Sequence, residues 1–174
     1  KFDSFEIVKG NTDGRDTLNI IDHPSNIASI VEFNANDLDG GKLSLSVGTK
    51  VDFDSFEILN GSSSGPDILE FENFTKKVNV NLREGFVSDG SSKTTVKNFE
   101  NVCGTNQDDT IEGNELYNKL EGKGGHDKLI GGHGRDYLLG GEGNDSFLFN
   151  INDGIDSVID TSGSADKISF LSDV

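Results

Sequence analysis

Apolar and polar residues alternate along much of the chain with the period of two that is typical of β-strands. Clear examples are Lys42 to Val47, Asp67 to Phe71 and Val78 to Leu82. Polar stretches between such runs, including Gly61 to Pro66 and Ser88 to Ser92, predict turns. The pattern therefore predicts an all-β protein.

An internal repeat indicates how these strands are arranged. The segment Phe2 to Ile7 returns 51 positions later as Phe53 to Ile58, and Leu18 then corresponds to Leu69. A looser third copy begins at Asn98. Repeats of this kind favour stacked coils, so we expect residues 1–103 to form irregular coils of a β-solenoid. The alternative is a pair of look-alike strands that do not stack.

From Gly104 the repeat shortens to nine residues and runs for five units, which end at residue 148. The units are GTNQDDTIE, GNELYNKLE, GKGGHDKLI, GGHGRDYLL and GGEGNDSFL. Glycine occupies position one throughout. Position six holds Asp109, Asn118, Asp127, Asp136 and Asp145, and position eight holds Ile111, Leu120, Leu129, Leu138 and Phe147.

Two such units can form one 18-residue coil of strand, turn, strand and turn. The apolar side chain at position eight then points inward, and glycines at positions one, two and four allow a positive φ in the turns. Turns on the same side recur at every second unit. We therefore expect Asp109 to stack near Asp127, Asn118 near Asp136, and Asp127 near Asp145.

Stacked carboxylates about 4.8 Å apart repel one another unless a cation lies between them. Calcium fits best, since it accepts six to eight oxygen ligands in irregular geometry, whereas magnesium demands an octahedron and soft metals prefer nitrogen or sulfur. We expect about three calcium ions, with a fourth if Asp156 closes the last turn. The site of Asp127 and Asp145 should be the best and that of Asn118 and Asp136 weaker. The expected ligands are the position-six residues Asp109, Asn118, Asp127, Asp136 and Asp145, with the loop glycines Gly122, Gly124, Gly125, Gly131, Gly132, Gly134, Gly140, Gly141 and Gly143.

The units at residues 131–139 and 140–148 are similar to the G-G-x-G-x-D-x-U-x repeat of the RTX family, the hemolysin-type calcium-binding repeat. The resemblance implies a parallel β-roll with calcium in its turns, and secretion by the type I system of a Gram-negative bacterium. The first two units depart from the pattern, since they contain few glycines and Asn118 replaces an aspartate. Residues 104–148 are thus expected to form the calcium-binding roll of a right-handed parallel solenoid.

The segment 149–174 is expected to cap the roll. Position nine changes from Glu112 and Glu121 to Ile130, Leu139 and Leu148, so the outer face becomes apolar toward the C-terminal end. An apolar outer face needs a cover to remain free of aggregation. The apolar residues of 149–174 can supply that cover.

The composition of the chain limits the kinds of binding partner that we expect. The chain of 174 residues carries a net charge of −16, contains 22 glycines and is only 32% hydrophobic. A polyanion repels nucleic acid and anionic membrane surfaces, and no apolar run approaches the roughly 18 residues of a membrane span. The single cysteine, Cys103, excludes an intramolecular disulfide and is expected to be a small core residue.

No catalytic motif is evident, and His126 and His133 are expected to be solvent-exposed without a shared metal. We therefore expect no enzyme but a calcium-binding module that drives calcium-dependent folding and secretion of a larger extracellular protein. Two alternatives remain: a non-catalytic module of a polysaccharide-acting exoenzyme, similar to alginate epimerases, or an adhesin or toxin segment that contacts a host or partner protein. Asp16 and Asp67 are further candidate calcium ligands in the larger coils.

Overall fold

The computed structural model describes residues 58–61 and 66–171 in full and, before them, the backbone of five strands. Within this part of the chain all regular structure is β, and no helix is long and apolar enough to cross a membrane. The strands are β1 (Val8–Lys9), β2 (Thr17–Asn19), β3 (Ser29–Asn34), β4 (Asp37–Leu45), β5 (Lys50–Asp54), β6 (Ile58–Asn60), β7 (Ile68–Glu70), β8 (Asn79–Asn81), β9 (Phe86–Ser88), β10 (Lys93–Lys97), β11 (Asn101–Cys103), β12 (Thr110–Glu112), β13 (Lys119–Gly124), β14 (Lys128–Ile130), β15 (Tyr137–Glu142), β16 (Ser146–Phe149), β17 (Ser157–Ile159) and β18 (Lys167–Phe170).

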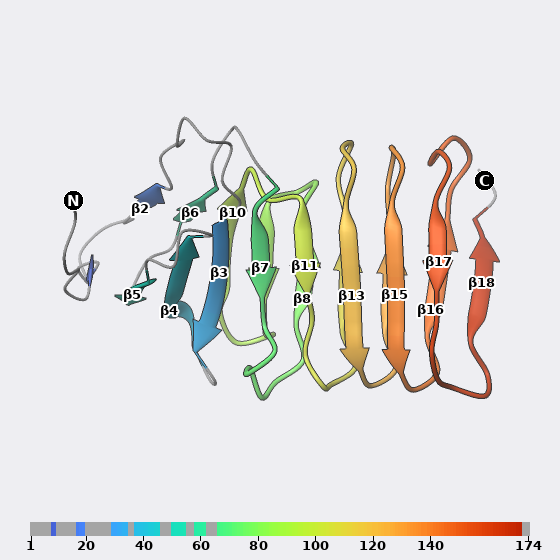
Figure 1. Cartoon of the computed structure of the whole chain (residues 1–174), viewed down its shortest axis with the longest axis horizontal. Helices are drawn as coiled ribbons and strands as arrows, with labels where there is room; N and C mark the ends of the chain where they lie inside the picture. The colour runs from blue at the N-terminus through green and yellow to red at the C-terminus, as the bar shows by residue number, and fades with distance from the viewer. Residues whose placement is uncertain are drawn as a thin grey trace.

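From β11 onward the chain alternates between two sheets and winds through about four turns of a solenoid. β11, β13, β15 and β17 lie side by side in one sheet, and β12, β14, β16 and β18 in the other (Figure 1). All of these pairs are parallel, and Val102 pairs with Leu120, which pairs with Leu138. The offset of two nine-residue units confirms the expected coil and the all-β, parallel solenoid fold.

The core lies between the two sheets and is built from position eight of each unit. The five residues at this position are at most 1% exposed. Each strand of three residues turns its middle side chain inward and the two flanking ones outward, as pleating dictates. Burial of each of these side chains contributes about 1.5–3 kcal/mol of stabilisation, so the apolar stripe holds the coils together.

The earlier coils contain antiparallel additions to the stack. β8, β9 and β10 form an antiparallel meander, and β10 then pairs in parallel with β6. The predicted turn at Ser88–Ser92 joins β9 to β10, where Asp89 Oδ1 accepts the N–H groups of Ser91 and Ser92. β3, β4 and β5 form a second antiparallel set. The alternation of apolar residues predicts these strands but does not distinguish parallel from antiparallel pairing.

The 51-residue repeat is not the stacking period of these coils. Leu18 in β2 pairs with Leu59 in β6, whereas its sequence counterpart Leu69 belongs to β7 in the other sheet. The first copy, at residues 2–7, lies outside the described residues. Similar sequences therefore occupy different places in successive coils.

The C-terminal segment adds one more coil to the end of the stack. Val158 in β17 pairs with Leu138, and Ile168 in β18 pairs with Phe147. The segment thus continues both sheets by one coil. That it covers the outward side chains at position nine remains a prediction. Several apolar side chains of this last coil are exposed, and Phe170 is 81% exposed.

Candidate metal centre

The turns of the roll use glycine in two ways. At positions two and four, Gly132, Gly134, Gly141 and Gly143 have φ values of 92°, 121°, 117° and 122°, which favour glycine. In the third unit Lys123 occupies position two with a φ of 82°. The glycines at position one are not among those with positive φ, so the expectation of a positive φ at that position was wrong.

Position one requires glycine because oxygen atoms crowd its α-carbon. A Cβ added to Gly122 would contact Asp127 Oδ2 and lie 2.7 Å from the carbonyl oxygen of Gly140. A Cβ on Gly104 would lie 2.7 Å from Asp109 Oδ2 and 2.6 Å from the carbonyl oxygen of Gly122. A side-chain oxygen of the same unit and a carbonyl oxygen of the next coil therefore converge here.

A ladder of hydrogen bonds links the position-six residues of successive coils. The N–H of Asp109 donates to Asp127 Oδ1 at 2.8 Å, and the N–H of Asp127 donates to Asp145 Oδ1 at 2.8 Å. On the opposite side of the roll, the N–H of Asn118 donates to Asp136 Oδ1 at 2.9 Å. The structure thus brings together the three pairs that the repeat predicts.

The second carboxylate oxygen of the later units has no such partner. Oδ2 of Asp127, Asp136 and Asp145 is buried without a hydrogen bond, in residues that are 2%, 1% and 0% exposed. Buried polar atoms in proteins are nearly always hydrogen-bonded, because an unpaired one is costly. Free carboxylate oxygens beside backbone carbonyls form an all-oxygen donor set, and this set fits calcium.

The first two units satisfy the corresponding atoms within the protein. Asp109 Oδ2 accepts the N–H of Thr105 at 2.7 Å, and its Oδ1 accepts the N–H of Val78 at 2.8 Å. Asn118 accepts the N–H of Asn114 at 2.7 Å and donates from Nδ2 to the carbonyl oxygen of Glu100 at 2.8 Å. These two side chains already have hydrogen-bond partners, unlike the later aspartates.

Burial disfavours ionisation of the position-six carboxyl groups when no calcium is bound. It is the main cause that raises the pKa of Asp127 to about 8, and the carboxylates of Asp109 and Asp145 add to the rise. Burial also raises the pKa of Asp109 and of Asp136 to about 6. The pKa of Asp145 is raised mainly by burial, with contributions from Asp160 and Asp166. A bound cation would favour the charged form of each group.

The ladder extends into the coil before the roll through a residue that the sequence analysis missed. The N–H of Asp67 donates to Glu100 Oε2 at 2.9 Å, and burial raises the pKa of Glu100 to about 6. Asp67 is fully buried, whereas Asp16 lies outside the described residues. Glu100 directly precedes β11, just as the position-six residues directly precede their strands. That placement is the signal that could have identified it.

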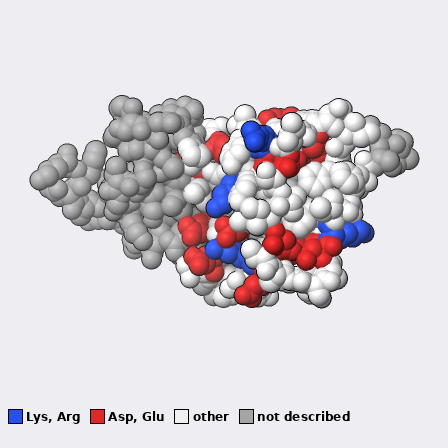
Figure 2. Space-filling model, turned by 45° about the vertical axis from the view of Figure 1, so that its right-hand side comes forward, with Lys and Arg blue, Asp and Glu red and all other residues white. Residues whose placement is uncertain are grey.

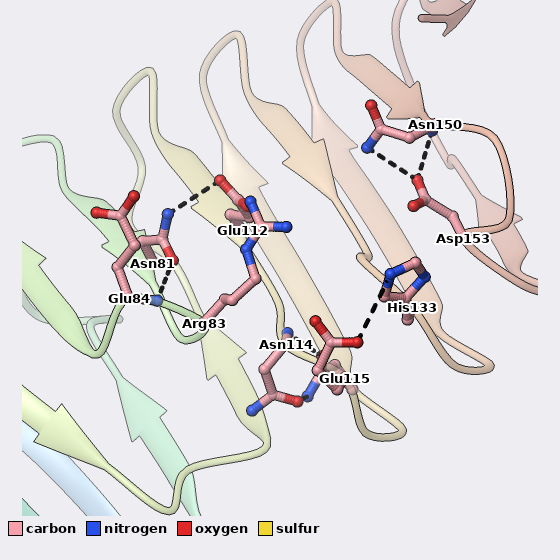
Figure 3. Close-up of polar contacts among 10 residues, drawn as sticks. Asn81, Arg83, Glu84, Glu112, Asn114, Glu115, His133, Asn150 and Asp153 are labelled. Atoms are coloured by element: carbon pink, nitrogen blue, oxygen red, sulfur yellow. Dashed lines mark hydrogen bonds and ion pairs between the residues drawn. The ribbon is translucent and has the colours of Figure 1, made fainter. Parts of the chain in front are cut away.

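The two histidines connect neighbouring coils at the surface. His126 Nδ1 accepts the N–H of Asn144 at 2.8 Å. His133 Nε2 lies 3.7 Å from Glu115 Oε2 (Figure 3). Nδ1 of His133 lies 3.0 Å from the carbonyl oxygen of Asn152. Both histidines are exposed, as expected, and their contacts are to protein groups.

Other polar contacts also tie coil to coil near the first unit. Asn81 Nδ2 donates to Glu112 Oε2 at 3.0 Å, and Arg83 forms an ion pair with Glu112 at 2.6 Å (Figure 3). Acidic side chains also gather in patches on the surface (Figure 2), in keeping with the net charge of −16. Cys103 is partly buried, and burial raises the pKa of its thiol to about 12, so it is not a thiolate nucleophile at neutral pH.

Comparison with known families bears on the turns that carry the free oxygens. Residues 118–147 match the family model described as RTX calcium-binding nonapeptide repeat (4 copies). This segment is an RTX calcium-binding repeat. RTX proteins are generally extracellular bacterial proteins, and RTX modules are typically non-catalytic. No curated protein matches the chain. The RTX segment includes Asn118, Asp127, Asp136 and Asp145.

Proposed function

We propose that the chain is a calcium-dependent folding module of a larger extracellular bacterial protein that is exported by type I secretion. The observation that carries the proposal is the row of buried, unpaired oxygens on Asp127, Asp136 and Asp145. These oxygens lie in the turns of an RTX repeat, and Oδ2 of Asp127 converges with the carbonyl oxygen of Gly140 on the α-carbon of Gly122. The expected ligands are these carboxylates together with the carbonyl groups of the loop glycines.

The same oxygens explain why folding should depend on calcium. Without the ion, closing the roll removes like-charged carboxylates from water and leaves one oxygen of each unpaired, which opposes folding. An ion that binds the folded form and not the open chain adds its binding free energy to folding. At a free concentration 100 times the dissociation constant, each site contributes about 2.7 kcal/mol. About three such ions can therefore decide whether the roll is closed.

Because calcium is scarce inside the cell and millimolar outside, the chain would fold only after it has left the cell. The acidic turns would keep the chain open and suitable for export, and the roll would close after release. This proposal requires an open state without calcium, so it is tested by comparing the two states directly.

The test is circular dichroism of the whole chain in chelator and during titration with calcium. We expect a transition from coil to β-sheet as calcium is added, and a much weaker response to magnesium. The triple variant Asp127→Asn, Asp136→Asn and Asp145→Asn should lose the calcium response. A control triple variant at exposed acids, Glu72→Gln, Glu115→Gln and Glu142→Gln, should keep it. The same β-sheet spectrum with and without calcium would contradict the proposal.

A further inference from the structure

The last turn of the structure, residues 160–166, differs from the repeat in one decisive position. Ile159 pairs with Leu139, so Asp160 occupies the place that Gly140 holds one coil earlier. Every nonapeptide unit has glycine at that position. This turn lies beyond residues 118–147, which match the RTX repeat. It therefore introduces a carboxylate where the repeat has no side chain.

This substitution creates a cluster of three carboxylates. Asp145, Asp160 and Asp166 each offer one oxygen, and the three oxygens lie within 4.8 Å of one another. A Cβ on Gly140 would contact Asp145 Oδ2 and lie 3.0 Å from Asp160 Oδ1. Among the described residues, no ion pair joins Lys or Arg to any of the three aspartates. Their negative charge is therefore not balanced by the protein.

The hydrogen bonds show which oxygens are free. Asp145 Oδ1 accepts the N–H of Asp127 at 2.8 Å, while its Oδ2 has no partner although Asp145 is 0% exposed. Asp160 Oδ1 accepts the N–H of Thr161 at 2.9 Å, and its Oδ2 is also buried without a partner. Asp166 Oδ1 accepts the N–H of Asp145 at 3.0 Å. Two buried oxygens without hydrogen bonds therefore belong to one cluster of three acids.

We propose that Asp160 and Asp166 complete, with the free Oδ2 of Asp145, a calcium site of three carboxylates in the turn that follows the RTX repeat. Three carboxylates provide the hard oxygen ligands that calcium prefers, and the exposed Asp166 leaves room for water to complete the coordination. The choice of ion rests on the proposed function. Ligand charge strengthens calcium binding, so this site binds more tightly than the turns that have glycine at position one. It fastens β17 and β18 to the coil before them.

The test is the calcium stoichiometry of the whole chain, measured by equilibrium dialysis with elemental analysis and by calorimetric titration. Asp160→Asn keeps the shape of the side chain and removes its charge, and Asp166→Asn tests a second ligand. Glu142→Gln is the matched control, because it removes one charge from an exposed side chain in the neighbouring turn. Hydrogen exchange of residues 157–170 in calcium provides a second, local measurement.

We expect Asp160→Asn and Asp166→Asn each to weaken one tightly bound ion at least about tenfold and to speed exchange in residues 157–170. Residues 119–148 should stay protected, and Glu142→Gln should match the unmodified chain. An unchanged stoichiometry and affinity in both variants would overturn the terminal site and leave the proposed function intact. Loss of several ions from either variant would contradict a site confined to this turn. An unmodified chain that binds no calcium would overturn both proposals.

Discussion

The N–H of Asp127 donates a 2.8 Å hydrogen bond to Oδ1 of Asp145, one coil further along the solenoid. Asp127 Oδ1 in turn accepts the N–H of Asp109. Each position-six aspartate thus uses one oxygen to hold the backbone of the preceding coil. In Asp127, Asp136 and Asp145 the other oxygen has no hydrogen bond and remains available to a cation, so one residue type links the fold of the roll to its ion binding.

Acid should stabilise the calcium-free roll. The pKa of Asp127 rises from 3.8 to about 8 on folding, and those of Asp109 and Asp136 rise from 3.8 to about 6. Because the folded state binds more protons, its stability is greatest below pH 4 and falls as the pH rises toward 8. Circular dichroism of protein stripped of calcium should therefore show more β-sheet at pH 5 than at pH 8.

Saturating calcium should reverse this trend, since protons compete with the ion for the same oxygens. The midpoint of thermal unfolding in saturating calcium should then be higher at pH 8 than at pH 5. Equal pH profiles with and without calcium would show that these carboxylates do not bind the ion.

Asp127→Asn should have opposite effects in the two states. Without calcium, the variant replaces an unpaired buried oxygen by an amide N–H beside the carbonyl of Gly140, so the free energy of unfolding should increase by about 1–3 kcal/mol. With calcium, it loses a charged ligand and should be less stable than the unmodified chain. The β-sheet content in chelator, measured by circular dichroism, and urea unfolding in calcium report the two effects, and Glu142→Gln serves as the control. Destabilisation in both conditions would indicate a purely structural role for Asp127.

Asn118→Asp should make the second unit dependent on calcium. The amide Nδ2 of Asn118 donates to the carbonyl oxygen of Glu100 at 2.8 Å and to Asn114 Oδ1 at 3.1 Å. A carboxylate would place oxygen against these acceptors, so the calcium-free chain should lose about 1–3 kcal/mol of stability. Added calcium should restore most of this loss and raise the measured number of bound ions. A loss that calcium does not restore would show that this turn cannot hold an ion.

Gly122→Ala should be far more damaging than Gly124→Ala, although the two positions lie in the same unit. A Cβ at Gly122 would contact Asp127 Oδ2, whereas the nearest atom to a Cβ at Gly124 is 3.3 Å away. Neither glycine is among those with positive φ. Crowding should cost Gly122→Ala about 1–3 kcal/mol, and Gly124→Ala should change stability by less than about 1 kcal/mol. Equal losses in thermal unfolding would contradict the role assigned to position one.

The nine-residue period contained the information for the roll. The apolar residue at position eight predicts the core, the turn residues predict the 18-residue coil, and the residue at position six predicts the stacked pairs. These predictions hold because a regular repeat places equivalent residues directly above one another. Asp160 and Glu100 lie where that regularity ends. The turn of residues 160–166 has one residue more than the turn of residues 140–145 on which it stacks, so only the strand pairing shows that Asp160 replaces a glycine. Alternation alone likewise could not show that β9 runs antiparallel to its neighbours.

The hydrogen bonds of the ladder all run in the same direction along the solenoid. This direction bears on how coils can be inserted or deleted in evolution. Asp109, Asp127 and Asp145 each accept a hydrogen bond from the coil before them and none of these bonds runs the other way. A coil inserted into or deleted from the middle of the stack would meet the same donor below and the same acceptor above. Duplication of one 18-residue coil would therefore lengthen the protein without altering any existing contact type.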